Sequence, residues 1–393
     1  MTDEVSIKIL RSFSELQIIR EVWESWPGNR DSEMESYLTF LQSHPGIECP
    51  HVLVVYRGGV PDCILVGRIE RGQVLCRVGY LQMSFSARIM CFVYGALRGK
   101  SSQENGDLMV EEILRSLSQG EADVAYMNFL REDSELFNSA LKKPGLLSRD
   151  YIRITKPHFA ASLPSTVEEF YRGLSSGARW QVKNKEKKLL KDFDGDVKVK
   201  CFRDAPEIDT FAPDVEQVAK TSYQRGLGVG FFDSPETREQ LRFKAQKGWL
   251  RAYVLYVAGR PCAFWIGDVN RGTFGSDFLA YDAELGKYSP GMFLITKVIE
   301  GFCAGNHEGI TAVDFATGHA QYKEVLSNQR WQESSVYIFA PSLKGVGLNL
   351  VRSLFLGMDR TIKAALERTN LLQRVKKAWR DRAKLKAAAR QEA

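Results

Sequence analysis

The chain has 393 residues and a formal net charge of +6, with 44% hydrophobic and 26% charged residues. This composition excludes a disordered, collagenous or coiled-coil chain, and the length predicts two domains. No apolar run reaches the roughly 18 to 20 residues of a membrane-spanning helix, and the first residues lack the apolar core of a secretory signal. We therefore expect a cytoplasmic protein.

The positive charge is concentrated at the C-terminal end. Residues 341–393 contain 13 Lys or Arg and four Asp or Glu, so the remaining chain is slightly acidic. This distribution argues against a nucleic-acid-binding body. The segment alternates apolar and basic residues, which predicts a helical extension that packs on the body to about Leu366 and continues as a solvated basic helix over residues 374–390. Contact with an acidic membrane surface, at the inner face of the membrane, is the alternative interpretation.

Cysteine and histidine give no sign of a disulfide framework or a metal site. Seven cysteines are scattered through the chain without a C-x-x-C pair, and most lie in apolar stretches. The five histidines lack the H-x-x-x-H spacing of metal-dependent hydrolases. We therefore expect no bound metal.

In chain order, the predicted elements form two similar halves. Residues 54–61 and 254–261 share Val, Tyr, Gly and Pro at equivalent positions, 200 residues apart, and both predict a strand, a Gly turn and a second strand. The other elements predicted for the two halves are strands 5–10 and 197–202, helices 14–26 and 205–222, helices 108–117 and 291–303, and strands 122–129 and 310–315. Each half is thus β-α-β-β-β-α-β, an α+β fold with mixed sheets. The expected domains are residues 1–155, residues 156–340 with a basic helix at their start, and the extension 341–393.

The helix entrance in the second half is a candidate phosphate site. The run Tyr288-Ser289-Pro290-Gly291-Met292 places a capping Ser, a Pro suited to the first helical position and a Gly without a side chain in sequence. Free N–H groups and the positive end of the helix dipole attract anions there. The alternative is an ordinary helix start. The first half has no Pro-Gly entrance at the corresponding residues 84–88.

Polar residues at two strand ends are the candidates for chemistry. Asp314 lies between Val313 and Phe315, so its carboxylate points away from these apolar neighbours. Tyr322 and Lys323 follow after a Gly turn. On the preceding strand, Asp277 shares a face with Tyr281 and needs an ionic partner or an open cleft. The alternative interpretation is a turn-capping Asp beside a solvated Lys.

Two further motifs have structural explanations. Residues 173–177 match G-x-S-x-G, but a nucleophile elbow needs a preceding strand and residues 165–171 predict a helix, so a serine hydrolase is not expected. The basic residues between Arg179 and Lys191 could contact phosphates of CoA, a nucleotide sugar or tRNA. A solvated helix face is the simpler explanation.

Taken together, these motifs resemble the GNAT-type acyltransferases, and most closely the CelD/BcsL-like branch associated with exopolysaccharide synthesis and related to FemAB-type aminoacyltransferases. The resemblance covers residues 174–331 well. It rests on Leu174-Ser175-Ser176, the hairpin Gly259-Arg260-Pro261, Ala280-Tyr281-Asp282, the 288–291 turn, Asp314-Phe315 and Tyr322-Lys323. The longer Gly-rich pyrophosphate loop of typical members is shortened here to Ser289-Pro290-Gly291.

The resemblance implies two tandem GNAT-like domains and direct transfer of an acyl group, most simply acetyl from acetyl-CoA, to an amine or hydroxyl of a sugar or envelope-polysaccharide precursor. It implies donor binding at residues 288–292, Asp314 or Asp277 as base, Tyr281 or Tyr322 as acid, and Lys323 as an anchor. The first half would then shape the acceptor cleft, and polysaccharide-synthesis proteins are expected partners. Two alternatives remain: a FemAB-type enzyme using aminoacyl-tRNA, although the long helical arm of those enzymes is missing, and a non-catalytic partner of a polysaccharide synthase.

Overall fold

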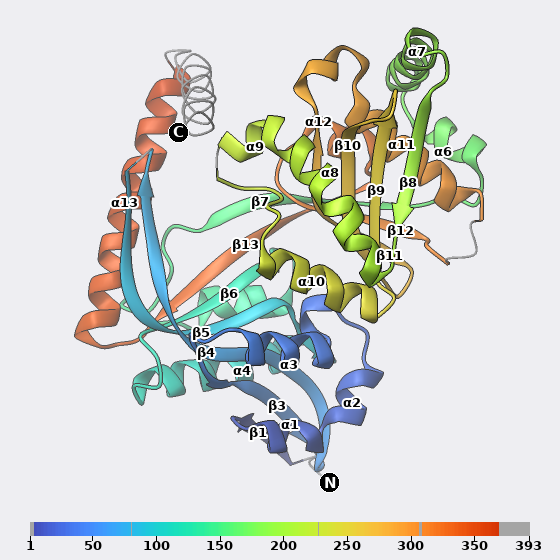
Figure 1. The fold of residues 1–393 in the computed structure, drawn as a ribbon. Helices are drawn as coiled ribbons and strands as arrows, with labels where there is room; N and C mark the ends of the chain where they lie inside the picture. Colours follow the sequence, from blue (N-terminus) through green and yellow to red (C-terminus); the bar gives the residue numbers. More distant parts are fainter. Residues whose placement is uncertain (1–3, 80, 227, 306–308, 369–393) are drawn as a thin grey trace. The chain divides into compact units, whose positions relative to one another are not determined.

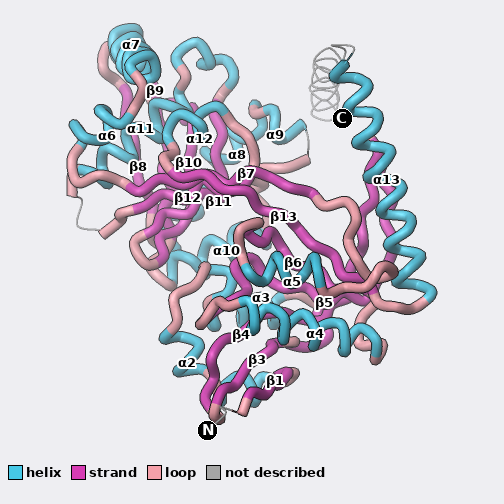
Figure 2. Tube along the Cα trace, turned by 180° about the vertical axis from the view of Figure 1, so that it is seen from behind, coloured by secondary structure: helices cyan, strands magenta, loops and turns pink. Residues whose placement is uncertain are grey.

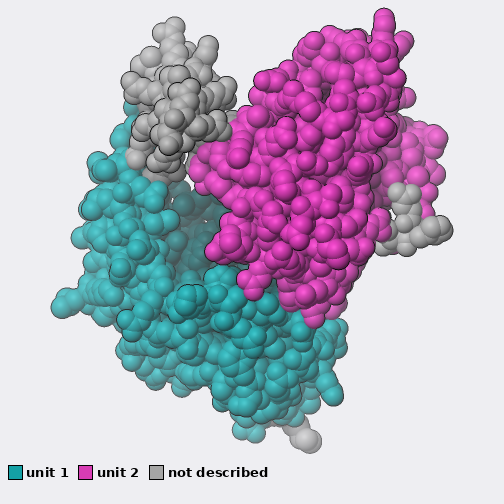
Figure 3. All heavy atoms as spheres, in the orientation of Figure 1, with its two compact units in different colours: residues 1–156, 331–371 teal, residues 157–330, 372–393 magenta. Residues whose placement is uncertain are grey.

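The computed structural model describes residues 4–79, 81–226, 228–305 and 309–368 (Figure 1). Of these, the residues up to 156 and those from 331 onward form one compact unit, the first unit, and residues 157–330 form the second unit (Figure 3). The sequence-predicted boundary at residue 340 differs from this division, because the strand that contains residues 331–339 pairs with the sheet of the first unit.

The first unit is built mainly from the N-terminal part of the chain. Its strands are β1 Val5–Leu10, β2 Ile47–Pro50, β3 Val52–Arg57, β4 Val60–Val78, β5 Leu81–Gly99, β6 Val124–Arg131 and, for most of its length, β13 Gln329–Phe339. Its helices are α1 Phe13–Ile18, α2 Arg20–Ser25, α3 Met34–Ser43, α4 Gln103–Ser118, α5 Glu135–Lys142 and α13 Leu343–Arg368. The single helix predicted over residues 14–26 is two short helices, because the chain leaves helical geometry at Ile19.

The second unit repeats this arrangement. Its strands are β7 Ile154–Ser162, β8 Val197–Phe202, β9 Leu250–Val257, β10 Arg260–Asn270, β11 Thr273–Tyr281 and β12 Ala312–Thr317. Its helices are α6 Val167–Gly173, α7 Ser176–Asp192, α8 Ile208–Thr221, α9 Tyr223–Gly226, α10 Pro235–Gln246, α11 Pro290–Cys303 and α12 Gln321–Leu326. The predicted α+β fold, with mixed strands and a helical C-terminal region, is confirmed.

The strand order is the same in both units. It runs β1-β3-β4-β5-β6-β13 in the first and β8-β9-β10-β11-β12-β7 in the second. In each, the fourth and fifth strands are parallel and the neighbours on either side are antiparallel. Strand β7 follows the first half of the chain yet completes the second sheet, whereas β13 follows the second half and completes the first. The two halves therefore exchange their sixth strand.

Helices cover both faces of the second sheet (Figures 1 and 2). On one face α11, α6 and α7 pack over residues such as Trp265 and Val313. On the other, α8 and α10 cover Phe264 and Ile266. The apolar residues of α8 recur at helical spacing, and each large side chain buried in this way contributes roughly 2 kcal/mol. These two layers hold the strand ends and the start of α11 in place.

Helix α13 packs on the first unit. Its Leu348 joins an apolar cluster with Val74, and Arg352 donates to Asp150 at 2.7 Å with both side chains buried. Arg360 still contacts the backbone oxygen of Arg153 at 2.9 Å. The basic helix predicted over residues 374–390 lies outside the described residues. None of the helices in the described ranges is long and apolar enough to cross a bilayer.

Candidate functional site

The parallel strands of the second unit diverge, and a cavity opens where they do. Strands β11 and β12 pair only over residues 273–275 and 312–314, although β11 continues to Tyr281 and β12 to Thr317. Helix α11 begins at this wedge. A cavity of about 750 Å³ lies there, with walls from α7, β11, the first two turns of α11, the end of β12 and α12. All of these elements belong to the second unit.

A β-bulge at Asp277 shapes one wall. Ile266 of β10 is opposite Phe278 and Gly267 is opposite Ser276, so Asp277 has no partner on that strand. The bulge turns its carboxylate into the cavity lining. Gly267 is required here, because a Cβ atom at this position would lie 2.0 Å from the carbonyl oxygen of Gly275.

Asp277 has the ionic partner that its place in an apolar strand demands. Lys244 of α10 contacts its carboxylate and lies 3.0 Å from Asp268 on the neighbouring strand. These three side chains are between 4% and 17% exposed, so the ammonium compensates two largely buried negative charges. Sequence reasoning missed Lys244. Helix α10 is rich in polar residues, and nothing in its sequence indicates which of its lysines points toward the sheet.

At the entrance of α11, Ser289, Gly291 and Met292 line the cavity, and their predicted role in donor binding stays a prediction. Ser289 adopts the left-handed conformation (φ 56°), and the first hydrogen bond of the helix runs from Phe293 N–H to Ser289 O at 3.0 Å. The N–H groups of the first turn are thus directed toward the wedge. A Cβ atom on Gly291 would lie 3.1 Å from the Tyr281 ring, so larger side chains enter space beside that ring. Left-handed geometry at a non-glycine residue is typical of functional turns.

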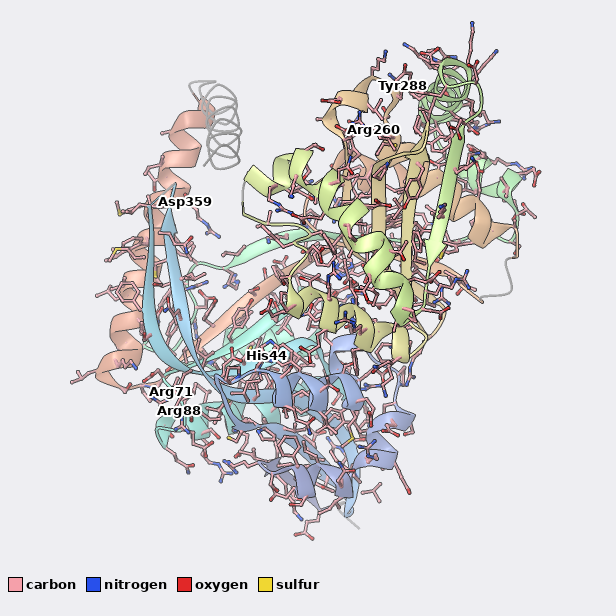
Figure 4. All side chains as sticks on the ribbon, in the orientation of Figure 1. His44, Arg71, Arg88, Arg260, Tyr288 and Asp359 are labelled. Carbon is pink, nitrogen blue, oxygen red and sulfur yellow. The ribbon has the colours of Figure 1, made fainter. Side chains whose placement is uncertain are left out.

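Tyr288 and Pro290 are placed differently from the prediction. Both are buried and neither lines the cavity. The Tyr288 hydroxyl donates to Asp192 at 2.9 Å and its ring packs on Phe193, which ties the turn to the end of α7 (Figure 4). Tyr288 therefore supports the turn and does not contact the cavity.

Asp314 is bound to a buried histidine that sequence reasoning missed. His158 of β7 is 1% exposed and donates from Nε2 to Asp314 Oδ1 at 2.6 Å. The same oxygen accepts the Ala316 N–H at 2.7 Å, and Asp314 retains 28% side-chain exposure. Asp314 does not line the cavity itself, although residues 315–323 do, because its side chain points away from the core that holds Val313 and Phe315. The pair exists because β7 joins this sheet.

The remaining predicted residues line the cavity. Tyr281 is 44% exposed, and Tyr322 packs edge-on against Phe315 at 6.0 Å. Lys323 is buried, and its Nζ donates to the carbonyl oxygens of Ala316 and Thr317 at 3.1 and 2.9 Å. Lys323 therefore holds the end of β12; its predicted role as an anchor for substrate stays a prediction.

Helix α7 brings charge to the opposite wall. Its Glu186 lies 2.6 Å from Lys297 of α11, which also contacts Glu300 at 2.8 Å. Burial lowers the pKa of Lys297, but the two carboxylates raise it by more, so the net pKa lies above its ordinary value and Lys297 is a cation at neutral pH. Ser175 of the G-x-S-x-G match caps α7, which agrees with the rejection of a nucleophile elbow.

The thiol of Cys262, on β10, is not activated as a nucleophile. Burial raises the pKa of Cys262 to about 12, so the thiol is protonated at neutral pH and a poor nucleophile. Within the described part of the chain, no three His, Cys, Asp or Glu side chains are grouped so that they could hold a metal ion.

Comparison with known families identifies the second unit. Residues 176–324 match the model of the acetyltransferase (GNAT) domain. This part of the chain is similar to GNAT acetyltransferase domains. The match begins with α7 and ends within α12, so it contains the elements that line the cavity. The protein is therefore an acyltransferase.

Solved structures give more distant likenesses. FemX is 10% identical over 83% of this chain and 96% of its own, with a TM-score of 0.49. A tandem GNAT protein from the clavulanic acid biosynthesis pathway is 11% identical over 86% of this chain and 100% of its own, also at 0.49. A conserved protein of unknown function from Bacteroides thetaiotaomicron is 11% identical over 85% and 100%, at 0.47. A comparison with curated proteins finds no match. Membership of the CelD/BcsL-like branch stays a prediction.

Proposed function

We propose that the second unit transfers an acyl group, in the simplest case acetyl, from acyl-CoA to an amine or hydroxyl of a sugar or exopolysaccharide precursor. The observation that carries this proposal is the cavity of about 750 Å³ between the diverging strands β11 and β12, with the start of α11 in its wall. Its volume is within the range of sites that bury a small organic ligand.

The donor phosphates fit the entrance of α11. The N–H groups of the first turn and the positive end of the helix dipole favour a negatively charged group there. Gly291 lines the cavity without a side chain, so no side chain at this position covers the first turn. The pantetheine arm then follows the wedge, which brings the thioester toward the Asp277 bulge. Lys185 supplies positive charge from the α7 side of the same cavity.

The transfer needs one proton acceptor and one proton donor. The acceptor nitrogen or oxygen attacks the thioester carbonyl carbon, the C–S bond breaks, and the electron pair leaves with sulfur as a thiolate. Asp314, held by His158 at the end of β12, is the first candidate for the base that takes the proton of the acceptor, because its side chain is 28% exposed whereas that of His158 is 1% exposed. The hydroxyl of Tyr281 or Tyr322 protonates the thiolate from the cavity wall.

Asp277 is the second candidate for the base. It lines the cavity directly, which Asp314 does not, but its charge is compensated by Lys244. Direct transfer without an acyl-enzyme agrees with the protonated state of Cys262, the buried thiol of β10.

We infer the chemical class of the acceptor from the polar residues that line the cavity and from the resemblance to the polysaccharide branch. Amide side chains of Gln181, Gln224 and Gln321 line the cavity, and amides both donate to and accept from sugar hydroxyls. Polysaccharide-synthesis proteins would then supply the precursor or receive the product.

The test is an assay of purified protein with acetyl-CoA and a panel of amino sugars and nucleotide sugars. We expect thiol release that matches an acetylated product one to one by mass spectrometry. Transfer from aminoacyl-tRNA with no use of acyl-CoA would replace the proposal with the FemAB-type reaction. The absence of transfer from either donor would favour a non-catalytic role.

A further inference from the structure

Three lysine side chains of the second unit gather at the turn that precedes α11. Lys185 of α7 donates from its Nζ to the carbonyl oxygen of Lys287 at 2.6 Å. The ammonium nitrogens of Lys188 and Lys287 lie 5.8 and 4.7 Å from the centre of the Tyr288 ring. The three cations therefore lie around residues 287 and 288, immediately before the Ser289 turn at which the helix begins.

The Tyr288 ring that two of these lysines share is held in place. Its hydroxyl donates to Asp192 at 2.9 Å, the ring packs edge-on against Phe193, and the residue is 4% exposed (Figure 4). Lys188 and Lys287 are exposed themselves, so a ligand in solvent can reach them. An aromatic ring attracts an ammonium group but carries no net charge, so the positive charge of the two lysines is not cancelled there.

Carboxylates do not neutralise this group of lysines. In the described part of the chain, no ion pair joins Lys185, Lys188 or Lys287 to an acidic residue. Lys297, which also lines the cavity, differs in this respect, because it lies 2.6 Å from Glu186. Like charges that are brought together without a counter-ion repel one another, so the arrangement around residues 287 and 288 favours a bound anion.

The structure divides the basic residues of α7 into two groups. Residues 185 and 188 are three positions apart and share the side of the helix that faces the 287–288 turn. Lys183 lies over the Tyr171 ring at 4.9 Å, and Lys187 follows it four positions later on that other side. Lys185 lines the cavity, whereas Lys183 and Lys187 do not. The first group is thus the one that adjoins the donor cavity.

We propose that Lys185, Lys188 and Lys287 bind a phosphate monoester, the 3′-phosphate of the CoA donor. This inference rests on the proposed use of acyl-CoA. CoA carries its 3′-phosphate on the same ribose as its pyrophosphate, so the two anions need neighbouring sites, and residues 287 and 288 directly precede the first turn of α11. A phosphate monoester has close to two negative charges at neutral pH, and its oxygens accept hydrogen bonds from several ammonium groups at once.

The test is isothermal titration of the full chain with CoA and with 3′-dephospho-CoA, which differ only in this phosphate. We expect CoA to bind at least about tenfold more tightly, with a ratio that falls as salt is added. Lys188→Gln with Lys287→Gln should reduce the ratio to about two or less and leave the affinity for 3′-dephospho-CoA nearly unchanged. The matched control is Lys183→Gln with Lys187→Gln, which removes the same charge from the other side of α7 and should keep the wild-type ratio. Circular dichroism checks that each variant is folded.

Each other outcome has a separate meaning. Equal binding of the two compounds by the wild type would overturn this inference and leave the donor site in place. An equal loss in the control variant would also overturn it, because the effect would then be general attraction by positive charge. Tighter binding of glucosamine 6-phosphate than of glucosamine, with no preference between the two CoA compounds, would assign the lysines to a phosphate of the acceptor instead. Binding of neither CoA compound would remove the proposed donor itself.

Discussion

The two units share a strand order but differ where their parallel strands diverge. In the second unit the bulge opposite β10 is the single residue Asp277, and the space beside it is a cavity. In the first unit four residues of β5, Val93–Ala96, stand opposite the one residue between Leu65 and Gly67 of β4. This longer bulge packs on the N-terminal segment, since a Cβ atom on Gly95 would lie 2.4 Å from that of Asn29. The first wedge is filled by its own chain.

The helix entrances differ in the same way. In the first unit α5 covers the start of α4, where Ser139 accepts from Gln103 at 2.7 Å and donates to Asp107 at 2.6 Å. Glu135 accepts a further hydrogen bond from Ser101, just before the helix. In the second unit the corresponding helix, α12, forms a wall of the cavity instead. The first entrance is closed by side chains, and the second is open to a ligand.

The pairing between the fifth and sixth strands brings different side chains together in the two units. Asp314 is opposite Ala160 in one sheet, and the corresponding Tyr126 is opposite Tyr337 in the other. Both strands then bulge at a left-handed residue, Ala316 or Phe129. The first unit has the Tyr126 hydroxyl beside the Ser335 hydroxyl, at 3.2 Å, where the second unit has Asp314 beside His158. The same backbone position thus carries two neutral hydroxyls in one unit and a carboxylate with a histidine in the other.

The largest expected effect is on turnover. Asp314→Asn keeps the size of the side chain but removes the proton acceptor, so we expect kcat to fall at least about a hundredfold. Acyl transfer at saturating donor measures it. Tyr126→Phe, at the corresponding position of the first unit, should leave kcat within about twofold. Near-wild-type turnover in the asparagine variant would remove Asp314 from the mechanism.

A stability effect of about 3 kcal/mol should appear in the first unit only. Arg98 is 1% exposed and donates to the carbonyl oxygens of Ser32, at 2.7 Å, and Trp26. Arg98→Met removes both hydrogen bonds, leaving the Trp26 oxygen without this donor and the Ser32 oxygen with that of the Trp23 indole alone, which costs about 3 kcal/mol in unfolding free energy. Urea denaturation measures it, with Arg88→Met as the control because Arg88 is largely exposed. A changed kcat/KM of the folded Arg98→Met variant would show that this residue of the first unit affects catalysis in the second unit, which would contradict the account.

Two matched glycines should respond by different amounts. A Cβ atom on Gly267 meets the Gly275 backbone oxygen at 2.0 Å, whereas one on Gly67 meets the Phe92 side chain at 2.6 Å. A backbone oxygen cannot move aside as a ring can, so Gly267→Ala should cost about 2 kcal/mol and Gly67→Ala about 1 kcal/mol. Thermal unfolding of both variants gives the order, and the reverse order would contradict the packing described for the bulge.

The buried histidines should give the smallest effect, visible in acid. His158 is hydrogen-bonded to Asp314, whereas both ring nitrogens of His51 are buried without a hydrogen-bond partner. Burial lowers the pKa of His51 from 6.5 to about 3. The unfolded state therefore binds the proton first, and stability present above about pH 6.5 is lost as the pH falls toward 3. His51→Leu should reduce the loss between about pH 7 and 5.5 by about 1 kcal/mol, measured by denaturation at both pH values. An unchanged pH dependence would show that His51 is not the titrating group.

Local patterns predicted much of the fold. The β-α-β-β-β-α-β order of each half follows from alternation and helical spacing, and the start of α11 follows from Pro290 at the first helical position; the capping predicted for the Ser289 side chain is wrong, since that side chain makes no cap hydrogen bond. Helix α10 was missed because its apolar positions are few, with Leu241 its one buried residue. Helix α3 was missed although Met34, Tyr37 and Leu41 recur at helical spacing.

The missing parts of the site are non-local. The exchange of β7 and β13 brings His158 to Asp314 across 156 positions, and no local spacing encodes such a pairing. Lys244 reaches Asp277 only because α10 folds back on the sheet. Tyr288 belonged to the right turn, but whether a turn residue faces a cavity or the core depends on what packs behind it, here Asp192 and Phe193.

Isothermal titration with acetyl-CoA tests most directly the claim that only the second unit holds a donor site. Three proteins are compared: the wild type, Gly291→Trp at the α11 entrance, and Glu104→Trp at the corresponding second residue of α4. The account predicts one site per chain, binding reduced at least about tenfold by Gly291→Trp, and wild-type affinity for Glu104→Trp. Binding that survives Gly291→Trp, or that is lost in Glu104→Trp, would contradict it.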